Sequence, residues 1–463
     1  MPSHYKNDAD VYQLQELTAS GNKAEIQEFC EAVHPAVIAE LIAPLDRDEA
    51  WAILRFIDFP YRAEIFSHLD GNSQVELVST LPRWEVAQLL AEMAPDDRAD
   101  LFKQLPEELR ESVLPALAYA EREDIRRLAA YEEGTAGSEM TSDYAAITPD
   151  LTAYEAIERL REIAPDRETI YYAYVVDEQR KLIGFVSLKD LILARRGQKV
   201  REFMHQDIIS AHVEDDPEDA ARKIQKYDIL ALPVLNSEGA LVGIITHDDA
   251  MDIITQEQTE DMEKLMAISG SHEQAMYMKT SALIHFKNRS PWIIALAVLG
   301  LLSGLIVQNF ENLLMQFAIL ATFMPMLADT GGNTGSQSAT LVIRALALKE
   351  IAVRDIFRIL GKEAQVALLL GVLLGVIAFL RVLFLGGGAT MPEEYSLYRI
   401  GIAISLALGL QVITSTLVGA LLPLGAAKMK WDPALVASPA LTTVVDITGL
   451  LIFFFTVRWV MGI

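Results

Sequence analysis

The chain has 463 residues, so several domains are expected, and its formal net charge is −25 at pH 7. Of its 64 acidic side chains, 55 lie in residues 1–285, whereas residues 286–463 are slightly basic. A half this acidic repels nucleic acid, which excludes that partner, and suits multivalent cations, although a solvated acidic surface also explains it. Cys30 is the only cysteine, which excludes a disulfide or a thiolate metal site within one chain.

Residues 1–135 are predicted to form an all-helical domain. Between residues 30 and 130, short amphipathic segments are separated by prolines, and apolar positions such as Val86 and Leu90 follow helical spacing. Stacked helices of this kind build a superhelix. The polar start, residues 1–14, has no apolar signal-peptide core, so we expect the acidic half to stay in the cytoplasm.

An internal repeat follows, with copies at residues 136–199 and 200–262. Each copy contains the element Gly-x-x-Ser/Thr-x-x-Asp, at Gly184–Asp190 and at Gly243–Asp249. Helical patterns alternate with two short apolar runs that are typical of buried strands: residues 182–186 and 241–245. The sequence therefore predicts two α/β domains of the same kind.

A connecting helix is predicted over residues 248–287, leading to the first membrane span. Acidic residues crowd its start: Asp248, Asp249, Asp252, Glu257, Glu260 and Asp261. Like charges on one helix repel each other unless something neutralises them. A bound divalent cation would do so.

Residues 288–463 are predicted to form a helical membrane domain with five spans. A helix needs about 20 apolar residues to cross a bilayer. The apolar runs lie at residues 292–309, 313–328, 364–385, 400–425 and 434–457. The second run is short, but it continues through a glycine-rich stretch to about residue 348.

Basic residues in the loops predict the orientation of these spans. One side of the membrane collects most of them: Lys287, Arg289, Arg344, Lys349, Arg354, Arg358, Lys362, Lys428 and Lys430. The opposite side has Arg399 and Arg458 near it, with Glu393 and Glu394. By the positive-inside rule, the N-terminus is cytoplasmic and Ile463 lies outside, in a bacterial inner membrane.

Asp446 lies deep in the fifth apolar run. A charge at that depth costs roughly 2.5–3.5 kcal/mol on insertion scales, so it normally faces a pore or a partner. The alternative is a protonated or paired structural aspartate. No intramembrane lysine lies nearby to pair with it. We therefore favour a pore.

A polar, glycine-rich stretch interrupts the second run between Pro325 and Gln337. We expect it to break the helix, and irregular backbone at membrane depth is tolerated where it is buried or lines water. Broken helices expose carbonyl groups that can coordinate cations. The alternative is close helix packing through small residues. Asn333 and Gln337 favour a pore lining.

The predicted pore has no histidine or cysteine for a soft transition metal. Carboxylate, hydroxyl and carbonyl oxygens suit a hard cation, and magnesium is often held through its water shell by one or two carboxylates. One Asp446 per chain is a sparse site. Two chains about a two-fold axis would place two carboxylates across one pore.

Taken together, these parts resemble the MgtE family of magnesium channels over almost the whole chain. Three motifs carry the resemblance, in this order: Glu133–Thr141, Gly331–Gln337 and Thr442–Gly449. The resemblance implies a homodimer with a helical N domain, a pair of CBS domains, a connecting plug helix and a five-helix pore. Asp446 then corresponds to the family's pore aspartate. Asn333 stays a candidate magnesium ligand on the evidence of the polar stretch alone.

The resemblance also implies ligands for the soluble half. In tandem CBS domains, the repeated element could hold ATP through Ser187, Asp190, Thr246 and Asp249, although many CBS pairs bind no nucleotide and only dimerise. Acids that fall where family members bind regulatory magnesium are Asp216, Glu218, Asp228, Asp249, Asp252, Glu257, Glu260 and Asp261. The match at Glu92 and Asp96 is looser. Asp249 is assigned to both ligands, so one assignment is in conflict with the other.

The predicted function is a magnesium-selective channel that closes when magnesium binds its cytoplasmic half. The first alternative is the same channel carrying another divalent ion, such as cobalt or manganese. A membrane-embedded enzyme is a second alternative, but the spans contain no histidine, cysteine or paired acid and base. A magnesium receptor without flux is a third, against which Asp446 argues.

Overall fold

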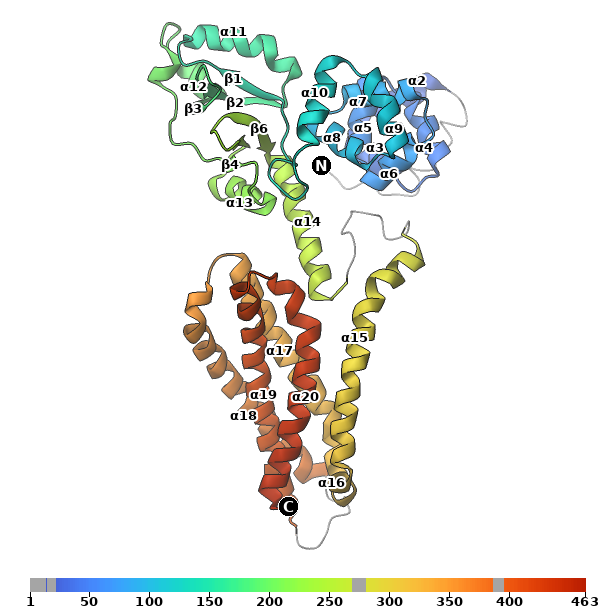
Figure 1. Cartoon of the computed structure of the whole chain (residues 1–463), viewed down its shortest axis with the longest axis vertical. Helices are drawn as coiled ribbons and strands as arrows, with labels where there is room; N and C mark the ends of the chain where they lie inside the picture. The colour runs from blue at the N-terminus through green and yellow to red at the C-terminus, as the bar shows by residue number, and fades with distance from the viewer. Residues whose placement is uncertain (1–13, 15–21, 269–279, 386–394) are drawn as a thin grey trace. The chain divides into compact units, whose positions relative to one another are not determined.

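The computed structural model describes Leu14 and residues 22–268, 280–385 and 395–463. They form two compact units (Figure 1). The first contains the described residues up to Glu257, and the second contains those from Gln258 onward.

Short helices stacked in chain order begin the first unit. They are α2 (Lys23–Ala32), α3 (Pro35–Ile42), α4 (Arg47–Leu54), α5 (Phe59–Ser67), α6 (Gly71–Val78), α7 (Arg83–Glu92), α8 (Pro95–Gln104), α9 (Glu107–Val113) and α10 (Tyr119–Leu128), with a 3-10 turn at Leu114–Ala116. Prolines stand in the first turns of α3, α5 and α8, where a missing N–H does no harm. The apolar faces form one core that includes Ile38, Leu54, Phe66 and Leu90.

Buried polar side chains fix the order of this stack. Gln74 on α6 donates through Nε2 to the carbonyl oxygens of Phe66 and Leu69, both at 3.0 Å, where α5 ends. Arg98 on α8 donates in the same way to Leu90 at 2.6 Å and to Met93 at 2.7 Å, where α7 ends. The last carbonyl groups of a helix have no partner within it, so these side chains lock each helix onto an earlier one.

The repeat folds into two small α/β domains of identical topology. The first contains β1 (Tyr144–Ile147), α11 (Ala153–Ile163), β2 (Thr169–Val176), β3 (Leu182–Ser187) and α12 (Leu188–Leu193), with 3-10 turns at Ala164–Asp166 and Val200–Glu202. The second contains β4 (Ala211–His212), α13 (Pro217–Tyr227), β5 (Ala231–Leu235) and β6 (Leu241–Thr246). In each, the first strand pairs parallel with the second, which pairs antiparallel with the third. The two strands predicted at residues 182–186 and 241–245 are confirmed.

The helix that follows the second sheet, α14 (His247–Leu265), ends earlier than predicted. Ala267 adopts φ +54°, and the N–H of Ile268 bonds back to the oxygen of Glu263 at 2.9 Å. A left-handed residue with such a bond is a helix stop. The prediction of one helix over residues 248–287 is therefore wrong for its middle, and residues 269–279 of that range lie outside the described residues.

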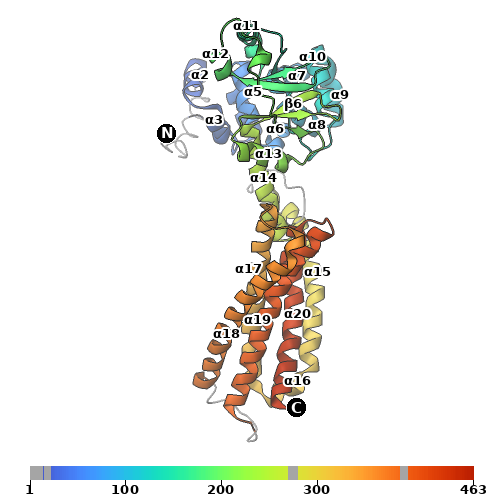
Figure 2. The same cartoon turned by 90° about the vertical axis from the view of Figure 1, so that its left-hand side faces the viewer.

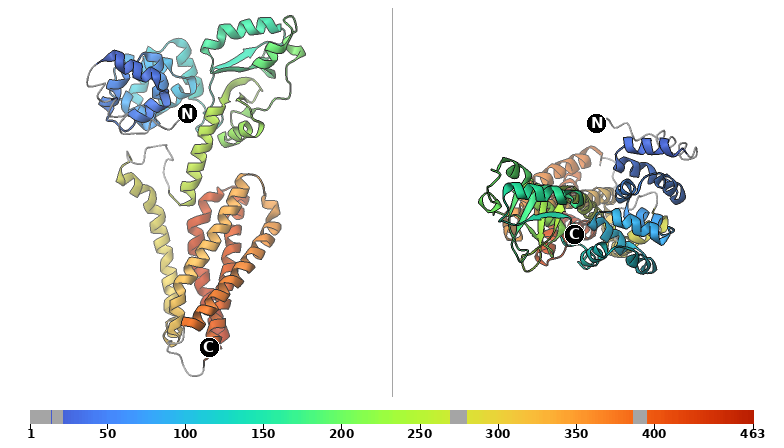
Figure 3. Two further views of the ribbon diagram at one scale, coloured as in Figure 1. Left: turned by 180° about the vertical axis from the view of Figure 1, so that it is seen from behind. Right: turned by 90° about the horizontal axis from the view of Figure 1, so that it is seen from above.

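The second unit is a helical bundle (Figures 2 and 3). Its elements are α15 (Ala282–Asn309), α16 (Glu311–Gln316), a 3-10 segment at Ala318–Phe323, α17 (Met324–Ala347), a 3-10 turn at Val353–Asp355, α18 (Ile356–Leu385), α19 (Leu397–Lys428) and α20 (Pro433–Met461). Four of them, α15, α18, α19 and α20, are long and apolar enough to cross a membrane. The predicted second span, residues 313–328, is divided among α16, the 3-10 segment and the start of α17. Glu393 and Glu394, used above for orientation, lie outside the described residues.

The glycine-rich stretch does not break α17, which runs through it as a continuous helix. Close packing explains this. A Cβ at Gly335 would lie 3.1 Å from the carbonyl oxygen of Ser415, and one at Gly419 would overlap the backbone of Gly335. Small residues let α17 and α19 approach closely, and Thr334 Oγ1 meets Ser415 Oγ at 3.0 Å between them. The alternative of packing through small residues is therefore the one the structure supports.

Candidate functional site

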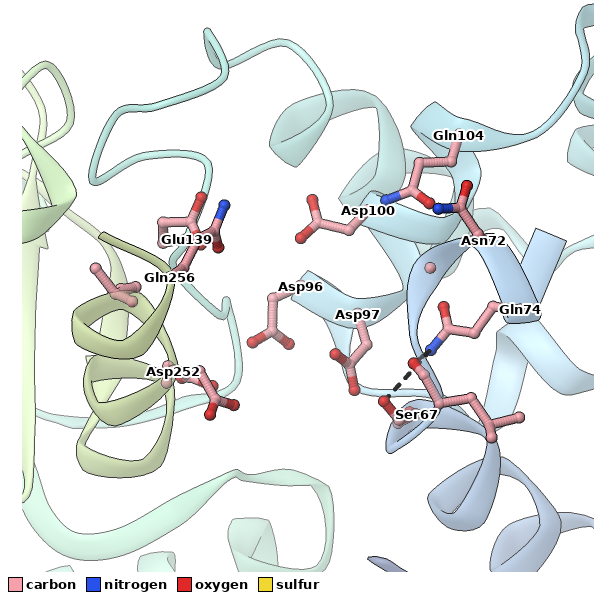
Figure 4. A pocket seen from close by; sticks show the side chains of 14 residues that line it. Ser67, Asn72, Gln74, Asp96, Asp97, Asp100, Gln104, Glu139, Asp252 and Gln256 are labelled. Carbon is pink, nitrogen blue, oxygen red and sulfur yellow. Dashed lines mark hydrogen bonds between the residues drawn. The ribbon is translucent and has the colours of Figure 1, made fainter. Parts of the chain in front are cut away.

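An acidic cavity of about 300 Å³ lies in the first unit (Figure 4). It is lined by Ser67, Leu69, Gly71, Asn72, Gln74, Asp96, Asp97, Asp100, Gln104, Glu139, Asp249, Asp252, Ile253 and Gln256. Six of these are carboxylates and none is basic. The lining comes from the end of α5, the start of α6, α8, the segment before β1 and the start of α14.

Local structure places each carboxylate. Asp96 and Asp97 stand in the first turn of α8, and Asp100 follows one turn later on the same side. Arg98 donates hydrogen bonds to the end of α7, and these bonds hold α8, which carries the three aspartates, in place. Asp249 stands in the first turn of α14, and its Oδ2 accepts hydrogen bonds from the N–H and the hydroxyl of Thr246.

Burial makes these carboxylates hard to ionise together. Burial, followed by the charges of Asp97 and Asp249, raises the pKa of Asp96 well above its usual range. Burial also raises the pKa of Asp97 to about 6, and the pKa values of Asp100, Glu139 and Asp249 for the same reason. One oxygen of Asp96, Oδ1, is buried and accepts no hydrogen bond from the part of the chain that the structure describes. A cation in the cavity would offset both burial and repulsion.

The acidic cavity has room for a hydrated cation. Within the described ranges, no three side chains of the Asp, Glu, His or Cys type converge to hold a bare metal ion. A cavity of about 300 Å³ leaves room for an ion with its water shell. Magnesium commonly binds in this manner, because it releases water reluctantly.

The pKa shifts predict how stability depends on pH. An acid whose pKa is raised on folding binds its proton more tightly in the folded state, so folding loses stability as the pH rises from the acid's ordinary pKa to its folded pKa. Burial likewise raises the pKa of Glu168, with the charge of Asp249 as the next cause, to about 7. In a chelator, we expect the melting temperature of the purified protein to rise as the pH falls from about 7 to about 5, and saturating magnesium to abolish most of that rise.

Calorimetry in detergent at constant ionic strength tests this. The same scan on Asp96→Asn with Asp97→Asn is the control, because it removes two of the shifted carboxyls. A melting temperature that falls over this range without magnesium would contradict the shifts.

In the second unit, Asp446 lies about midway along α20. Its Oδ1 is buried and finds no hydrogen-bond partner among the residues described. Asn333 on α17 is exposed within this single chain, and its Nδ2 donates to Asp329 Oδ1 at 3.1 Å. An unpaired carboxylate in the middle of a membrane-spanning helix is expensive in lipid.

Family models match the chain in three sections. A model described as the MgtE intracellular N domain matches residues 33–134, the CBS domain model matches 136–197 and 200–256, and a model described as a divalent cation transporter matches 324–456. The magnesium transporter MgtE of Thermus thermophilus is 36% identical, covering 96% of this chain and 97% of the relative. That of Bacillus subtilis is 31% identical, covering 95% and 94%.

The chain belongs to the MgtE family. Two solved structures resemble its soluble part, each with a TM-score of 0.50. One is the cytosolic domain of the Mg2+ channel MgtE in complex with ATP, 36% identical over 52% of this chain and 99% of that one. The other is the soluble part of a magnesium transporter, 31% identical over 53% and 97%. The predicted family membership and its combination of domains are confirmed, and the family is one of transporters, as expected for a chain predicted not to be an enzyme.

The sequence located the acidic cavity only in part. Of the acids assigned to regulatory magnesium, Asp96, Asp249 and Asp252 line it, whereas Glu92 is exposed and does not. Three further carboxylates were missed: Asp97, Asp100 and Glu139. The spacing of Asp96 and Asp100, one turn apart on α8, and the position of Glu139 inside a family motif were the signals available.

The acids assigned on α13 have local structural contacts instead. Asp216 caps the helix by accepting from the N–H of Glu218 at 2.8 Å, and Glu218 pairs with Arg222. Asp228 ends the helix in the left-handed region at φ 50°. None of the three lines the acidic cavity, so their binding of magnesium stays a prediction.

On α14, the carboxylate of Glu260 forms an ion pair with the side chain of Lys264. Lys264 Nζ lies 2.6 Å from Glu260 Oε1 and 2.9 Å from Asp432 Oδ2. Burial alone would lower the pKa of Lys264, but the hydrogen bonds and charges of these two carboxylates raise it. Asp432 also caps α20 by accepting from the N–H of Ala434 at 2.8 Å. The ammonium therefore joins the end of α14 to the start of the helix that carries Asp446.

Replacing Lys264 should make this junction depend on magnesium. In Lys264→Met, Glu260 and Asp432 would face each other as like charges, so we expect a lower melting temperature, corresponding to a loss of about 1 kcal/mol, in a chelator. A divalent cation can bridge the two carboxylates, so added magnesium should restore more stability to the variant than to the wild type. Lys428→Met serves as the control, since no ion pair of Lys428 is found among the described residues. An equal rise in melting temperature on adding magnesium to all three proteins would contradict a magnesium bridge between Glu260 and Asp432.

The residues predicted to bind ATP form two equivalent caps at helix N-termini. Ser187 Oγ donates to Asp190 Oδ2 at 2.6 Å, Asp190 contacts His205 at 3.1 Å, and Thr246 bonds Asp249 in the same way as Ser187 bonds Asp190. A small cavity of about 60 Å³ lies in the same pair of domains, with aromatic and aliphatic walls. It is lined by Tyr172, Tyr174, Phe185, Asp207, Ile208, Ile209, Ile229, Ala231 and Pro233. Asp249 lines the acidic cavity and not this one.

Proposed function

We propose that this chain carries magnesium across a membrane along a path that passes Asp446, and that magnesium bound to its soluble half closes that path. The observation that carries the transport proposal is the buried, unpaired Oδ1 of Asp446. Relatives that share 36% and 31% of its residues over nearly its whole length are named magnesium transporters. A channel for cobalt or manganese with the same regulation is the alternative.

The bundle supports a path shared between two chains. No residue of α15 is buried, and most of the membrane-length part of α18 is uncovered within one chain. Lipid can cover apolar helices of this kind, but the exposed Asp329, Asn333 and Gln337 on α17 need polar or aqueous surroundings. A two-fold dimer in the bacterial inner membrane, with the acidic half in the cytoplasm, meets this need and places two copies of Asp446 in one pore.

The acidic cavity supports the regulatory part of the proposal. Its carboxylates repel one another without a cation, so the helical domain and the start of α14 should separate when magnesium is scarce. Magnesium needs only a better fit to the closed arrangement than to the open one in order to shift the balance. Small-angle scattering of the fragment 1–262, with and without magnesium at matched ionic strength, tests this directly. The radius of gyration should be smaller with magnesium.

ATP is a second proposed ligand of the soluble half. A relative's cytosolic domain has been solved with ATP. The aromatic walls of the small cavity, Tyr172 and Phe185, suit an adenine ring, and Asp207 offers a hydrogen-bond acceptor. Binding of ATP measured by calorimetry, lost in Phe185→Ala, tests this assignment.

Uptake into proteoliposomes under an imposed voltage tests the transport proposal. Wild-type protein should take up magnesium passively, and cobalt or manganese should compete weakly. Stronger uptake of cobalt or manganese than of magnesium would favour the alternative ion. No uptake of any divalent ion would contradict transport.

A further inference from the structure

Gln411 is a polar side chain of α19 that is completely buried between two other helices. It is 1% exposed, and its Nε2 donates a hydrogen bond of 2.9 Å to the backbone oxygen of Leu327 on α17. Its Oε1 is also buried and accepts no hydrogen bond from the described part of the chain. A hydrocarbon side chain of this size would fill the space without an unpaired polar atom, so packing alone does not account for the amide.

Two glycines make room for this amide. A Cβ at Gly331 of α17, or at Gly449 of α20, would lie under 3.0 Å from the Gln411 side chain. The amide therefore touches both helices at once and sets how closely each approaches α19. Gly449 follows Asp446 by three residues, which is less than one helical turn. The contact thus lies at the level of the proposed ion site.

A second polar contact lies between α17 and α19. Thr334 Oγ1 lies 3.0 Å from Ser415 Oγ, one turn further along α17 and α19. Ser415 Oγ also bonds the carbonyl oxygen of Gln411 at 2.8 Å. The position of α17 along α19 is consequently fixed by hydrogen bonds rather than by apolar contact alone.

We propose that Gln411 is a positioning residue that fixes the spacing of α17 and α20 beside Asp446, and that this spacing selects magnesium over larger divalent cations. The inference rests on the proposed transport through Asp446. Magnesium requires a near-octahedral shell of fixed size, whereas calcium accepts six to eight ligands in flexible geometry. A rigid spacing therefore favours the octahedral hydrated ion, and a loosened one admits calcium.

Gln411→Met tests the proposal, because methionine fills nearly the same volume without the hydrogen bond to Leu327. In proteoliposomes, we expect the ratio of magnesium to calcium uptake to fall by about tenfold, which corresponds to about 1.4 kcal/mol of lost discrimination between the two ions. The melting temperature in detergent should stay equal or rise. Gln365→Met on α18 is the control, since Gln365 is exposed and donates within its own helix. It should keep the wild-type ratio.

A single and a double variant at Gly331 and Gln411 distinguish a positioning role of the amide from simple packing. Gly331→Ala should displace the amide and lower both the melting temperature and the ion ratio. Gln411→Ala added to it removes the clash with the amide, but the ion ratio should stay low. Recovery of the ion ratio in the double variant would overturn the proposal. Should Gln411→Met not fold, Gln411→Asn keeps an amide that is too short to reach Leu327, and the same loss is expected.

Asp446→Asn in the same assay distinguishes a failure of the proposed transport path from a failure of the positioning role of Gln411. If Asp446→Asn still transports magnesium, the proposed path is wrong. If Asp446→Asn is inactive but Gln411→Met keeps the wild-type ratio, the path stands and only the positioning role fails.

Discussion

Asp446→Asn should reduce magnesium uptake by at least about 100-fold while the protein still folds. Two unit charges at about 4 Å attract by about 4 kcal/mol at an effective dielectric constant of about 20, and a divalent ion doubles this. Asparagine has the size and the hydrogen-bonding oxygen of aspartate, so the substitution removes mainly the charge. Each 1.4 kcal/mol lost is worth about a factor of ten.

Uptake of magnesium into proteoliposomes measures this effect, with melting in detergent as the check on folding. Asp177→Asn is the matched control, because Asp177 lies in the β2–β3 hairpin and an asparagine there can still accept from the N–H groups of Gln179 and Lys181. Wild-type uptake by Asp446→Asn would show that no ion passes this carboxylate.

Neutralising the acidic cavity should leave transport intact but disable its control. In Asp96→Asn with Asp249→Asn, two of the six lining carboxylates lose their charge. Repulsion and magnesium binding are both weakened, and we expect the loss of binding to dominate, since closure requires an ion that joins α8 to α14. The cytoplasmic magnesium concentration for half-closure should rise at least about tenfold, the effect of about 1.4 kcal/mol of lost binding.

A control variant that loses the same number of charges distinguishes magnesium binding in the cavity from an effect of overall net charge. Glu107→Gln with Glu108→Gln removes two charges from exposed positions outside the cavity. Patch recordings should show wild-type closure for this control. If both double variants shift closure equally, the overall charge of the soluble half, and not the cavity, sets the response.

The local pattern of the sequence predicted the elements that depend on neighbours in the chain. The strands at residues 182–186 and 241–245 appear as β3 and β6, because buried strands carry their apolar signal within a few residues. The stop of α14 was missed, since an alanine at positive φ carries no such signal. The helix break expected near Gly331 was wrong because α19 supplies the contacts that stabilise a glycine-rich helix.

The acidic cavity depends on contacts that sequence spacing cannot give. Asp97 and Asp100 read as a solvated face of α8 when that helix is considered alone. They become a binding site only because α8 stands opposite Asp249, about 150 residues later in the chain. Gln411 is a similar case, since its partners Gly331 and Gly449 come from the helices on either side.

Magnesium current through wild-type channels in a membrane patch, recorded while magnesium is stepped on the cytoplasmic face, decides whether Asp446 lines a path that cytoplasmic magnesium closes. We expect inward magnesium current when cytoplasmic magnesium is low and closure when it reaches the millimolar range, with Asp446→Asn silent at both. Current that persists unchanged at high cytoplasmic magnesium in the wild type, or current in Asp446→Asn, would contradict this expectation.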